Sequence, residues 1–205
     1  MTQDRAVHTR RRILSAASEE FAAAGFRGTS LARICERANL STGALTFHFP
    51  SKQHLALAVV RLGHAVTEAA VDNAARRTAV PLTAVMNVTL ALVRLLDEDP
   101  VVRAAARLAQ EGPEAQQPWQ SLWLPQLRCL VARAHCAGQL AEHTDPGDVL
   151  ALAVHLVAGA ECPGPGLAAD DGQDLALRAD RVWHLAAQGF APAAPGPRTD
   201  PRPGP

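Results

Sequence analysis

Apolar residues recur every three or four positions along most of this chain, which is the spacing of amphipathic helices. The first such stripe consists of Ile13, Ala16, Ala17, Phe21 and Ala24. It predicts a helix over about 9–24 with Gly25 as its C-cap. No alternating β-branched run of useful length appears, so we expect an all-α fold.

The remaining helices are expected between clusters of Gly, Pro and Asp. They cover about 52–77, 82–96, 100–110, 122–137, 148–160 and 174–189. The last segment, 191–205, is rich in Pro, Gly and Ala and has little to bury, so it is expected to be a disordered tail.

Residues 29–52 contain two short helical segments joined by a tight turn. The first segment carries apolar residues at helical spacing, namely Leu31, Ile34, Cys35 and Ala38. Asn39 and Leu40 then break the run, and Ser41 is a good N-cap for the next segment. This is the punctuation of a helix-turn-helix, whose second helix lies in the major groove of DNA.

A step of about 100° per residue divides the second segment into two sides. One side carries Ala44, Leu45, His48 and Phe49. The other is expected to face the groove and carries Thr42, Gly43, Thr46 and Phe47. Small hydroxyls, apolar contacts to thymine methyl groups and close backbone approach all suit base edges. The alternatives are that Phe47 is core and that the two threonines are solvated surface.

The next helix begins with a second N-cap candidate, Ser51, followed by the only lysine of the chain, Lys52. His48 and Lys52 are expected to reach phosphate there, because the uncompensated positive end of a helix beside a lysine attracts anions. The full set of expected DNA-binding residues is Thr29, Ser41, Thr42, Gly43, Thr46, Phe47, His48 and Lys52.

Charge is distributed unevenly although the total is zero. Residues 1–62 hold nine Lys or Arg against four acids, a net charge of +5, and residues 63–205 hold eleven against sixteen, a net charge of −5. A charge run usually marks only a solvated face, but here it coincides with the helix-turn-helix. A basic N-terminal head is what attraction to phosphate requires.

Two segments carry a dense motif. Residues 13–26 read I-L-x-A-A-x-x-x-F-x-x-x-G-F, and residues 29–52 read T-S-x-x-x-I-x-x-x-A-x-L-S-x-G-A-L-x-F-H-F-x-S-K. Both resemble the DNA-binding domain of the TetR family of repressors. The resemblance covers about the first third of the chain, and it implies a DNA-binding repressor built entirely of helices.

Within that family, residues 43–52 followed by Leu-Ala-Leu-Ala-Val at 55–59 look most like the γ-butyrolactone autoregulator receptors and their relatives, which control antibiotic production in actinomycetes. Two positions depart from the pattern. Thr42 stands where a lysine is common, and Thr46 stands where a tyrosine usually touches the DNA backbone. These departures bear on affinity and operator identity rather than on the docking mode.

The resemblance continues in the C-terminal part. Its segments are P-V-V-R-A at 100–104, A-R-L at 106–108, Pro118 with Trp119 and Trp123, and G-Q-L at 138–140. It implies that Trp123 lines a ligand pocket, for which Trp gives an apolar wall and one N–H donor. The expected ligand-binding residues are Trp119, Trp123, Leu92, Val88 and Arg107. The alternative is that both tryptophans are ordinary core anchors.

Catalytic motifs are absent from the sequence, as are metal-binding spacings, so we expect neither an enzyme nor a cofactor. A metal or redox sensor built from His135, Cys136 and His143 is the weak alternative. No apolar stretch looks long enough to span a bilayer, and the first twelve residues are polar and rich in arginine. The protein is therefore expected to be soluble and cytoplasmic.

Together these patterns predict a homodimer with a helix-turn-helix domain over 1–51 and a helical ligand-binding and dimerisation domain over 52–190. Two heads are needed because one recognition helix reads too few bases of a palindromic operator. By resemblance, the last two helices form the dimer interface. A small hydrophobic effector would release the operator by population shift. A ligand-blind repressor, and an enzyme or carrier with a DNA-binding-like head, remain as alternatives.

Overall fold

The computed structural model describes residues 2–111, 118–161 and 175–190, and within these ranges every regular element is a helix. The all-α prediction is confirmed. The elements are α1 (Thr2–Gly28), α2 (Leu31–Ala38), α3 (Thr42–His48), α4 (Lys52–Arg76), α5 (Pro81–Glu98), α6 (Pro100–Glu111), the 3₁₀ turn η1 (Trp119–Leu122), α7 (Leu124–Cys136), α8 (Pro146–Glu161) and α9 (Leu175–Phe190). The tail predicted over 191–205 lies outside the described residues.

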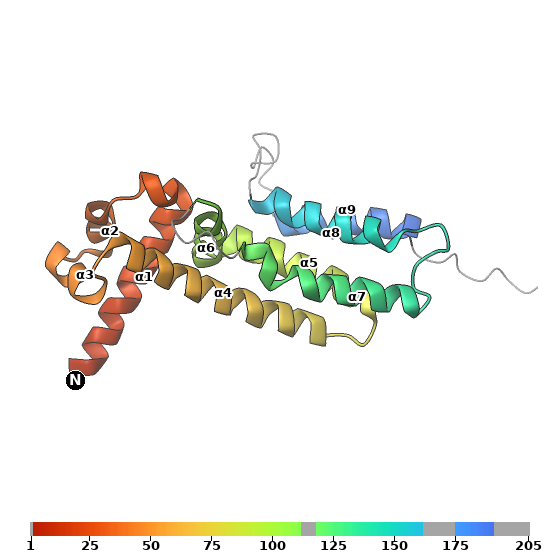
Figure 1. Ribbon diagram of the computed structural model, residues 1–205, viewed down its shortest axis with the longest axis horizontal. Coiled ribbons are helices and arrows are strands. Elements are labelled where there is room, and N and C mark those ends of the chain that lie inside the picture. The colour runs from red at the N-terminus through yellow and green to blue at the C-terminus, as the bar shows by residue number, and fades with distance from the viewer. Residues whose placement is uncertain (1, 112–117, 162–174, 191–205) are drawn as a thin grey trace, which may run out of the picture.

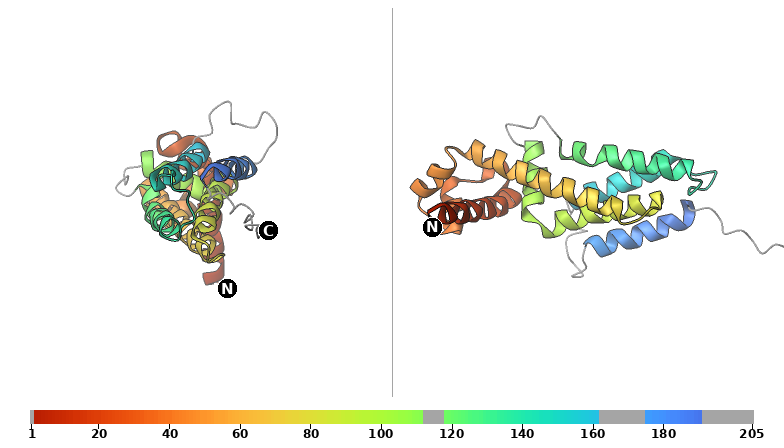
Figure 2. Two further views of the ribbon diagram at one scale, coloured as in Figure 1. Left: turned by 90° about the vertical axis from the view of Figure 1, so that its right-hand side faces the viewer. Right: turned by 90° about the horizontal axis from the view of Figure 1, so that it is seen from below.

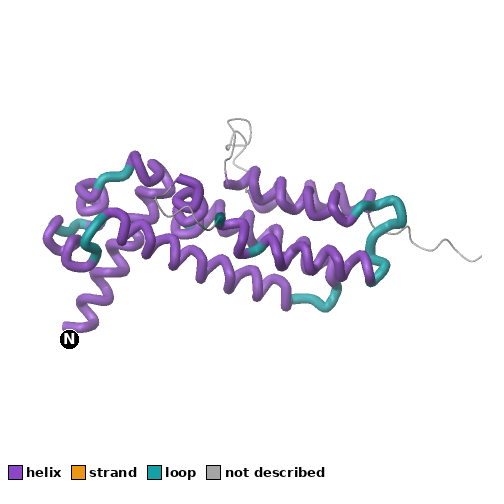
Figure 3. The backbone as a smooth tube through the Cα atoms, viewed as in Figure 1, coloured by secondary structure: helices purple, strands orange, loops and turns teal. Residues whose placement is uncertain are grey.

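The molecule is elongated, with a small head at one end and a helical body at the other (Figure 1). The head consists of α1, α2 and α3, and α4 runs from it along one side of the body (Figure 2). α5, α7, α8 and α9 form the rest of the body, and the short helix α6 lies crosswise between the two parts (Figure 3).

Serine caps set the helix starts in the head, as the sequence predicts. The hydroxyl of Ser41 accepts the N–H of Ala44 at 3.2 Å, and Ser51 accepts the N–H of His54 at 3.3 Å. Asn39 adopts the left-handed conformation at φ 49° and ends α2. The helices of the body end within two residues of the predicted positions.

α1 differs from its prediction at both ends. It begins at Thr2 instead of near residue 9, because residues 4–8 are exposed and polar enough to hide the helix from an apolar pattern. Gly25 interrupts it at φ 67° and ψ −176°, so the predicted C-cap is a bend, after which the chain makes one more turn to Gly28.

Two hydrophobic cores lie in the structure, and α6 contributes to both. The head core contains Phe21, Ile34 and Leu45 of the head together with Leu55 and Val59 of α4. Two further members come from α6, namely Ala104 and Leu108. The body core takes three other α6 residues, namely Val102, Ala106 and Ala109. The domain boundary between 51 and 52 stays a prediction, but the packing that supports the head reaches well beyond it.

α4 corrects one expectation. By length and composition this 25-residue helix could cross a membrane, so the sequence does contain one such stretch. Its buried residues, however, recur every fourth position against α1, α5 and α6: Leu55, Val59, Gly63, Thr67 and Val71. This is the pattern of a helix packed on one side within a protein.

Candidate functional site

α3 presents the two sides that the sequence predicts. Leu45 and Phe49 are 0% and 3% exposed in the head core, whereas Phe47 is 83% exposed. The alternative that Phe47 belongs to the core is therefore wrong. Leaving this much of a phenylalanine in water is unfavourable, and a partner that covers the ring would gain the free energy of burying it.

The other residues of this outer face are Thr42, Gly43 and Thr46, all exposed. The hydroxyl of Thr46 donates to the carbonyls of Thr42 at 3.0 Å and Gly43 at 3.2 Å. Its proton is therefore used within the helix. Thr46 retains a methyl group and an acceptor oxygen, which suit a thymine methyl group or a cytosine amino group.

Thr29 is not placed where the sequence predicts. Its side chain is buried, and its hydroxyl donates to the carbonyls of Gly25 at 2.8 Å and Glu20 at 3.0 Å. The expectation that this side chain binds DNA is corrected, because it fastens the bend in α1 instead.

Lys52 also points inward. Its ammonium donates to the carbonyls of Phe26 at 2.8 Å and Thr29 at 2.9 Å, and it lies 4.4 Å from the centre of the Phe26 ring. Two of the three N–H groups of the ammonium thus bond backbone carbonyls that follow the bend in α1 and lack helical partners. These contacts give Lys52 a structural role, and the phosphate role expected from the sequence stays a prediction.

Acidic and basic side chains join α1 to α2 in a cluster that the sequence analysis missed. Glu20 is 2% exposed and forms ion pairs with Arg33 at 3.1 Å and Arg37 at 2.8 Å. Glu19 also pairs with Arg37 at 2.7 Å. The hydrogen bonds that Arg37 donates to Glu20 and Glu19 raise the pKa of its guanidinium above the ordinary value. The cluster fixes the angle between α1 and α2 and leaves the outer face of α3 uninvolved.

In the body, the structure brings four of the five expected ligand-binding residues into one core. Trp119 and Trp123 lie edge to face with ring centres 5.7 Å apart. Val88 and Leu92 of α5 are fully buried in the same core and contribute apolar packing. Trp119 Nε1 donates to the hydroxyl of Thr67 at 3.0 Å.

Trp123 is 1% exposed, and its Nε1 has no hydrogen-bond partner among the described residues. A buried donor without an acceptor costs about 1–3 kcal/mol. Native proteins rarely keep such a group unless something else binds it, so the N–H of Trp123 is a ready donor to a ligand oxygen.

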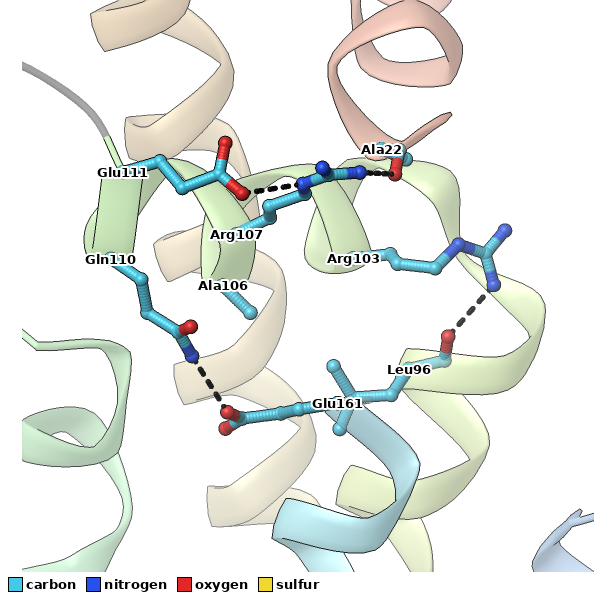
Figure 4. Close-up of a pocket in the computed structure, with 8 residues that line it drawn as sticks. All are labelled: Ala22, Leu96, Arg103, Ala106, Arg107, Gln110, Glu111 and Glu161. Atoms are coloured by element: carbon cyan, nitrogen blue, oxygen red, sulfur yellow. Dashed lines mark hydrogen bonds and ion pairs between the residues drawn. The ribbon is translucent and has the colours of Figure 1, made fainter. Parts of the chain in front are cut away.

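Arg107, the fifth expected residue, lies elsewhere. Its guanidinium donates to the carbonyls of Ala22 at 3.1 Å and Ala23 at 3.0 Å, and it pairs with Glu111 at 2.9 Å (Figure 4). It therefore contacts the bend in α1 and not the tryptophans. The expectation that Arg107 shares their site is corrected.

Two cavities flank α6 on the side of α8. One, of about 380 Å³, lies between α1, α6 and the end of α8 (Figure 4), and the other, of about 350 Å³, reaches Trp119. They share Ala106, Gln110 and Glu161. Gln110 donates to Glu161 at 2.9 Å, and burial raises the pKa of Glu161 more than this bond lowers it. The larger cavity is lined mainly by charged and polar side chains, whereas the one that reaches Trp119 combines apolar walls with three polar side chains.

Metal-binding clusters do not occur in the part of the chain that the structure describes. The alternative metal sensor is therefore unsupported, and Cys136 is an exposed free thiol.

Known proteins resemble this chain in both parts. Residues 13–59 match the family model described as bacterial regulatory proteins, tetR family. The A-factor receptor protein of Streptomyces griseus is 27% identical over 146 residues, which are 70% of this chain and 50% of the receptor. The chain thus spans about half the length of that curated relative.

Solved structures match almost the whole chain. A γ-butyrolactone receptor described as ArpA-like is 27% identical with a TM-score of 0.73, over 92% of this chain and 91% of the receptor. A structure described as the molecular basis for control of antibiotic production by bacterial hormones is 31% identical with a TM-score of 0.65, over 90% of this chain and 98% of that one. These matches show that the chain belongs to the TetR family of bacterial regulatory proteins and is similar to the γ-butyrolactone receptors.

Proposed function

We propose that the protein is a cytoplasmic, homodimeric repressor that binds a palindromic operator and releases it when a small hydrophobic effector enters the body. The observation that carries the effector part is the buried Trp123 Nε1 without a partner among the described residues. The observation that carries the DNA part is the outer face of α3 with its exposed Phe47.

On the DNA side, α3 enters the major groove. Thr42, Gly43, Thr46 and Phe47 contact base edges, and Phe47 supplies apolar contact for a thymine methyl group. Ser41 and His48 lie at the two ends of α3, where backbone N–H groups and an imidazole are near the phosphates. This division assigns sequence preference to the middle of the helix and positioning to its ends.

Dimerisation follows from the need for two heads and from the surface of α9. Three large apolar side chains of this helix are exposed in the single chain: Leu177, Val182 and Leu185, at 52%, 44% and 69%. Covering them against α8 and α9 of a second copy would bury apolar surface and fix the half-site spacing.

The effector is a molecule with an apolar part and an oxygen acceptor, such as a γ-butyrolactone, a butenolide or an antibiotic pathway product. Its apolar part would pack on Trp119, Val88 and Leu92, and its oxygen would accept the Trp123 N–H. Binding then favours a conformer in which the two recognition helices no longer match the operator.

The DNA part is tested by selecting binding sites from a random duplex library and measuring affinity by fluorescence anisotropy. We expect a palindromic site, bound as a dimer. Phe47→Ala should weaken this binding at least about tenfold, as loss of one base contact does, while leaving thermal stability unchanged. Selection of no site, or of a single half-site bound by a monomer, contradicts the proposal.

The effector part is tested by titrating γ-butyrolactones into the protein bound to labelled operator. Trp123→Phe keeps an aromatic ring but replaces the indole with a smaller ring that has no N–H, so we expect about fivefold weaker effector binding from the lost neutral hydrogen bond. Loss of this N–H should not itself destabilise the ligand-free protein, because no described residue accepts it, so any loss of stability should come only from the smaller ring.

Trp119→Phe is the matched control, because its N–H is already bonded to Thr67. It should lose the same packing as Trp123→Phe and, in addition, about 1 kcal/mol of stability for the hydrogen bond to Thr67, but it removes no hydrogen bond to the effector. A protein that binds operator and never releases it with any lactone, butenolide or pathway product is instead the ligand-blind repressor.

A further inference from the structure

Besides the continuous helix α4, hydrogen bonds from α6 to the bend in α1 connect the body to the head (Figure 4). At Gly25 the helix stops, and the carbonyls of Ala22 and Ala23 are left for other donors. Arg107 supplies one guanidinium nitrogen, Nη1, to both carbonyls, from a position 85 and 84 residues along the chain.

Glu111 holds Arg107 in this position. Its carboxylate accepts the Arg107 Nε–H at 2.9 Å, one turn further along α6. The fit to the bend is close, because a Cβ placed on Gly25 would lie 2.0 Å from Glu111 Oε2 and 3.0 Å from Arg107 Nε. The pair therefore packs directly onto the one residue that breaks α1.

No comparable side-chain contact in the described residues ties α6 to α1 by hydrogen bonds. The neighbouring arginine of the same cavity, Arg103, donates to the carbonyls of Leu96 and Asp97 at the end of α5. Arg103 thus joins α6 to α5 within the body, whereas Arg107 joins α6 to α1 of the head (Figure 4).

We propose that Arg107, oriented by Glu111, is a positioning residue that sets the angle between head and body and thereby the distance between the two recognition helices of the dimer. The inference rests on the proposed function, since it needs a dimer that reads two half-sites. Because Arg107 and Glu111 also line the cavity of about 380 Å³, a molecule filling that cavity would act on this angle directly.

How firmly this angle is held can be measured from the affinity for operators whose two half-sites lie at different spacings. One added base pair moves a half-site by about 3.4 Å and rotates it by about 35°, so only a flexible joint accepts the change. We expect the wild type to lose about tenfold in affinity when the spacer of its selected palindrome changes by one base pair, and Arg107→Ala to lose about threefold or less.

Arg103→Ala is the matched control, because it removes the same group from the same helix and cavity. It should keep the wild-type spacing profile. Arg107→Lys should restore part of the discrimination, since an ammonium can still reach a carbonyl. Glu111→Gln should give an intermediate profile, and it also serves as the test if Arg107→Ala does not fold.

The outcomes separate the two ideas. If the wild type selects no palindrome, the proposed function fails. If it selects one, and Arg107→Ala and Glu111→Gln keep the wild-type profile or weaken binding equally at every spacing, the positioning role is refuted. The same conclusion follows if Arg103→Ala broadens the profile as much as Arg107→Ala.

Discussion

Replacing Lys52 by Met tests whether this lysine serves the fold or the DNA. The substitution keeps most of the side chain and removes the ammonium. The carbonyls of Phe26 and Thr29 then lose their donor, and the Phe26 ring loses a cation 4.4 Å from its centre. We therefore expect the effect in stability.

The magnitude follows from the contacts. A hydrogen bond to a charged group contributes about 1.5–3 kcal/mol. Lys52 is only half-buried, so water can reach the carbonyls of Phe26 and Thr29, and about 1 kcal/mol for each bond is the appropriate value. The cation–π contact adds about 0.5–1 kcal/mol. The total of about 2–3 kcal/mol corresponds to a fall in Tm of about 5–10 °C for a chain of this size.

The assay pairs thermal unfolding at fixed protomer concentration with the salt dependence of binding to a non-specific duplex. Arg11→Met is the control, because it removes a positive charge from an exposed position of the same head. Loss of a phosphate contact lowers the slope of log K against log salt by about one unit. A Lys52→Met protein with unchanged Tm and a slope reduced by that amount would refute the structural role.

Two further outcomes follow from α4. Gly63→Ala should destabilise the protein by about 1–3 kcal/mol in urea unfolding, since its Cβ would lie 2.4 Å from Ala105 Cβ and overpack the crossing of α4 and α6; an unchanged midpoint would show that the crossing yields freely. Burial lowers the pKa of His64 below 6.5 more than Glu68 raises it. The unfolded chain therefore takes up the proton first, so stability should fall as pH drops below about 6.5, and His64→Gln should flatten that fall. A pH dependence identical in the variant would count against this assignment.

The head was predictable because its signals are local. Ser41 and Asn39 mark helix ends within a few residues of the groups they bond, and the apolar spacing that places Leu45 inside also places Phe47 outside. Where a side chain bonds the backbone of a neighbouring turn, the local sequence is enough to predict the position of that residue.

Two of the residues whose expected roles differ from their contacts, Lys52 and Arg107, make bonds over long sequence distances. Lys52 bonds a carbonyl 26 residues away, and Arg107 bonds one 85 residues away. No periodicity relates such positions. The family resemblance implied a pocket role for Trp123, but the absence of an acceptor for its Nε1 among the described residues is visible only in the packing.

Because α6 completes the core of the head, residues 1–51 cannot be moved to another protein as an independently folded DNA-binding domain. A transplant of residues 1–51 would carry Phe21 and Ile34 but leave behind Leu55, Val59 and Leu108, which close the same core. A chimera with another regulator would have to bring a matching α6 surface with it. Under the proposed function, changes in operator preference would arise on the outer face of α3, while the inner surface of the head would have to vary together with the body.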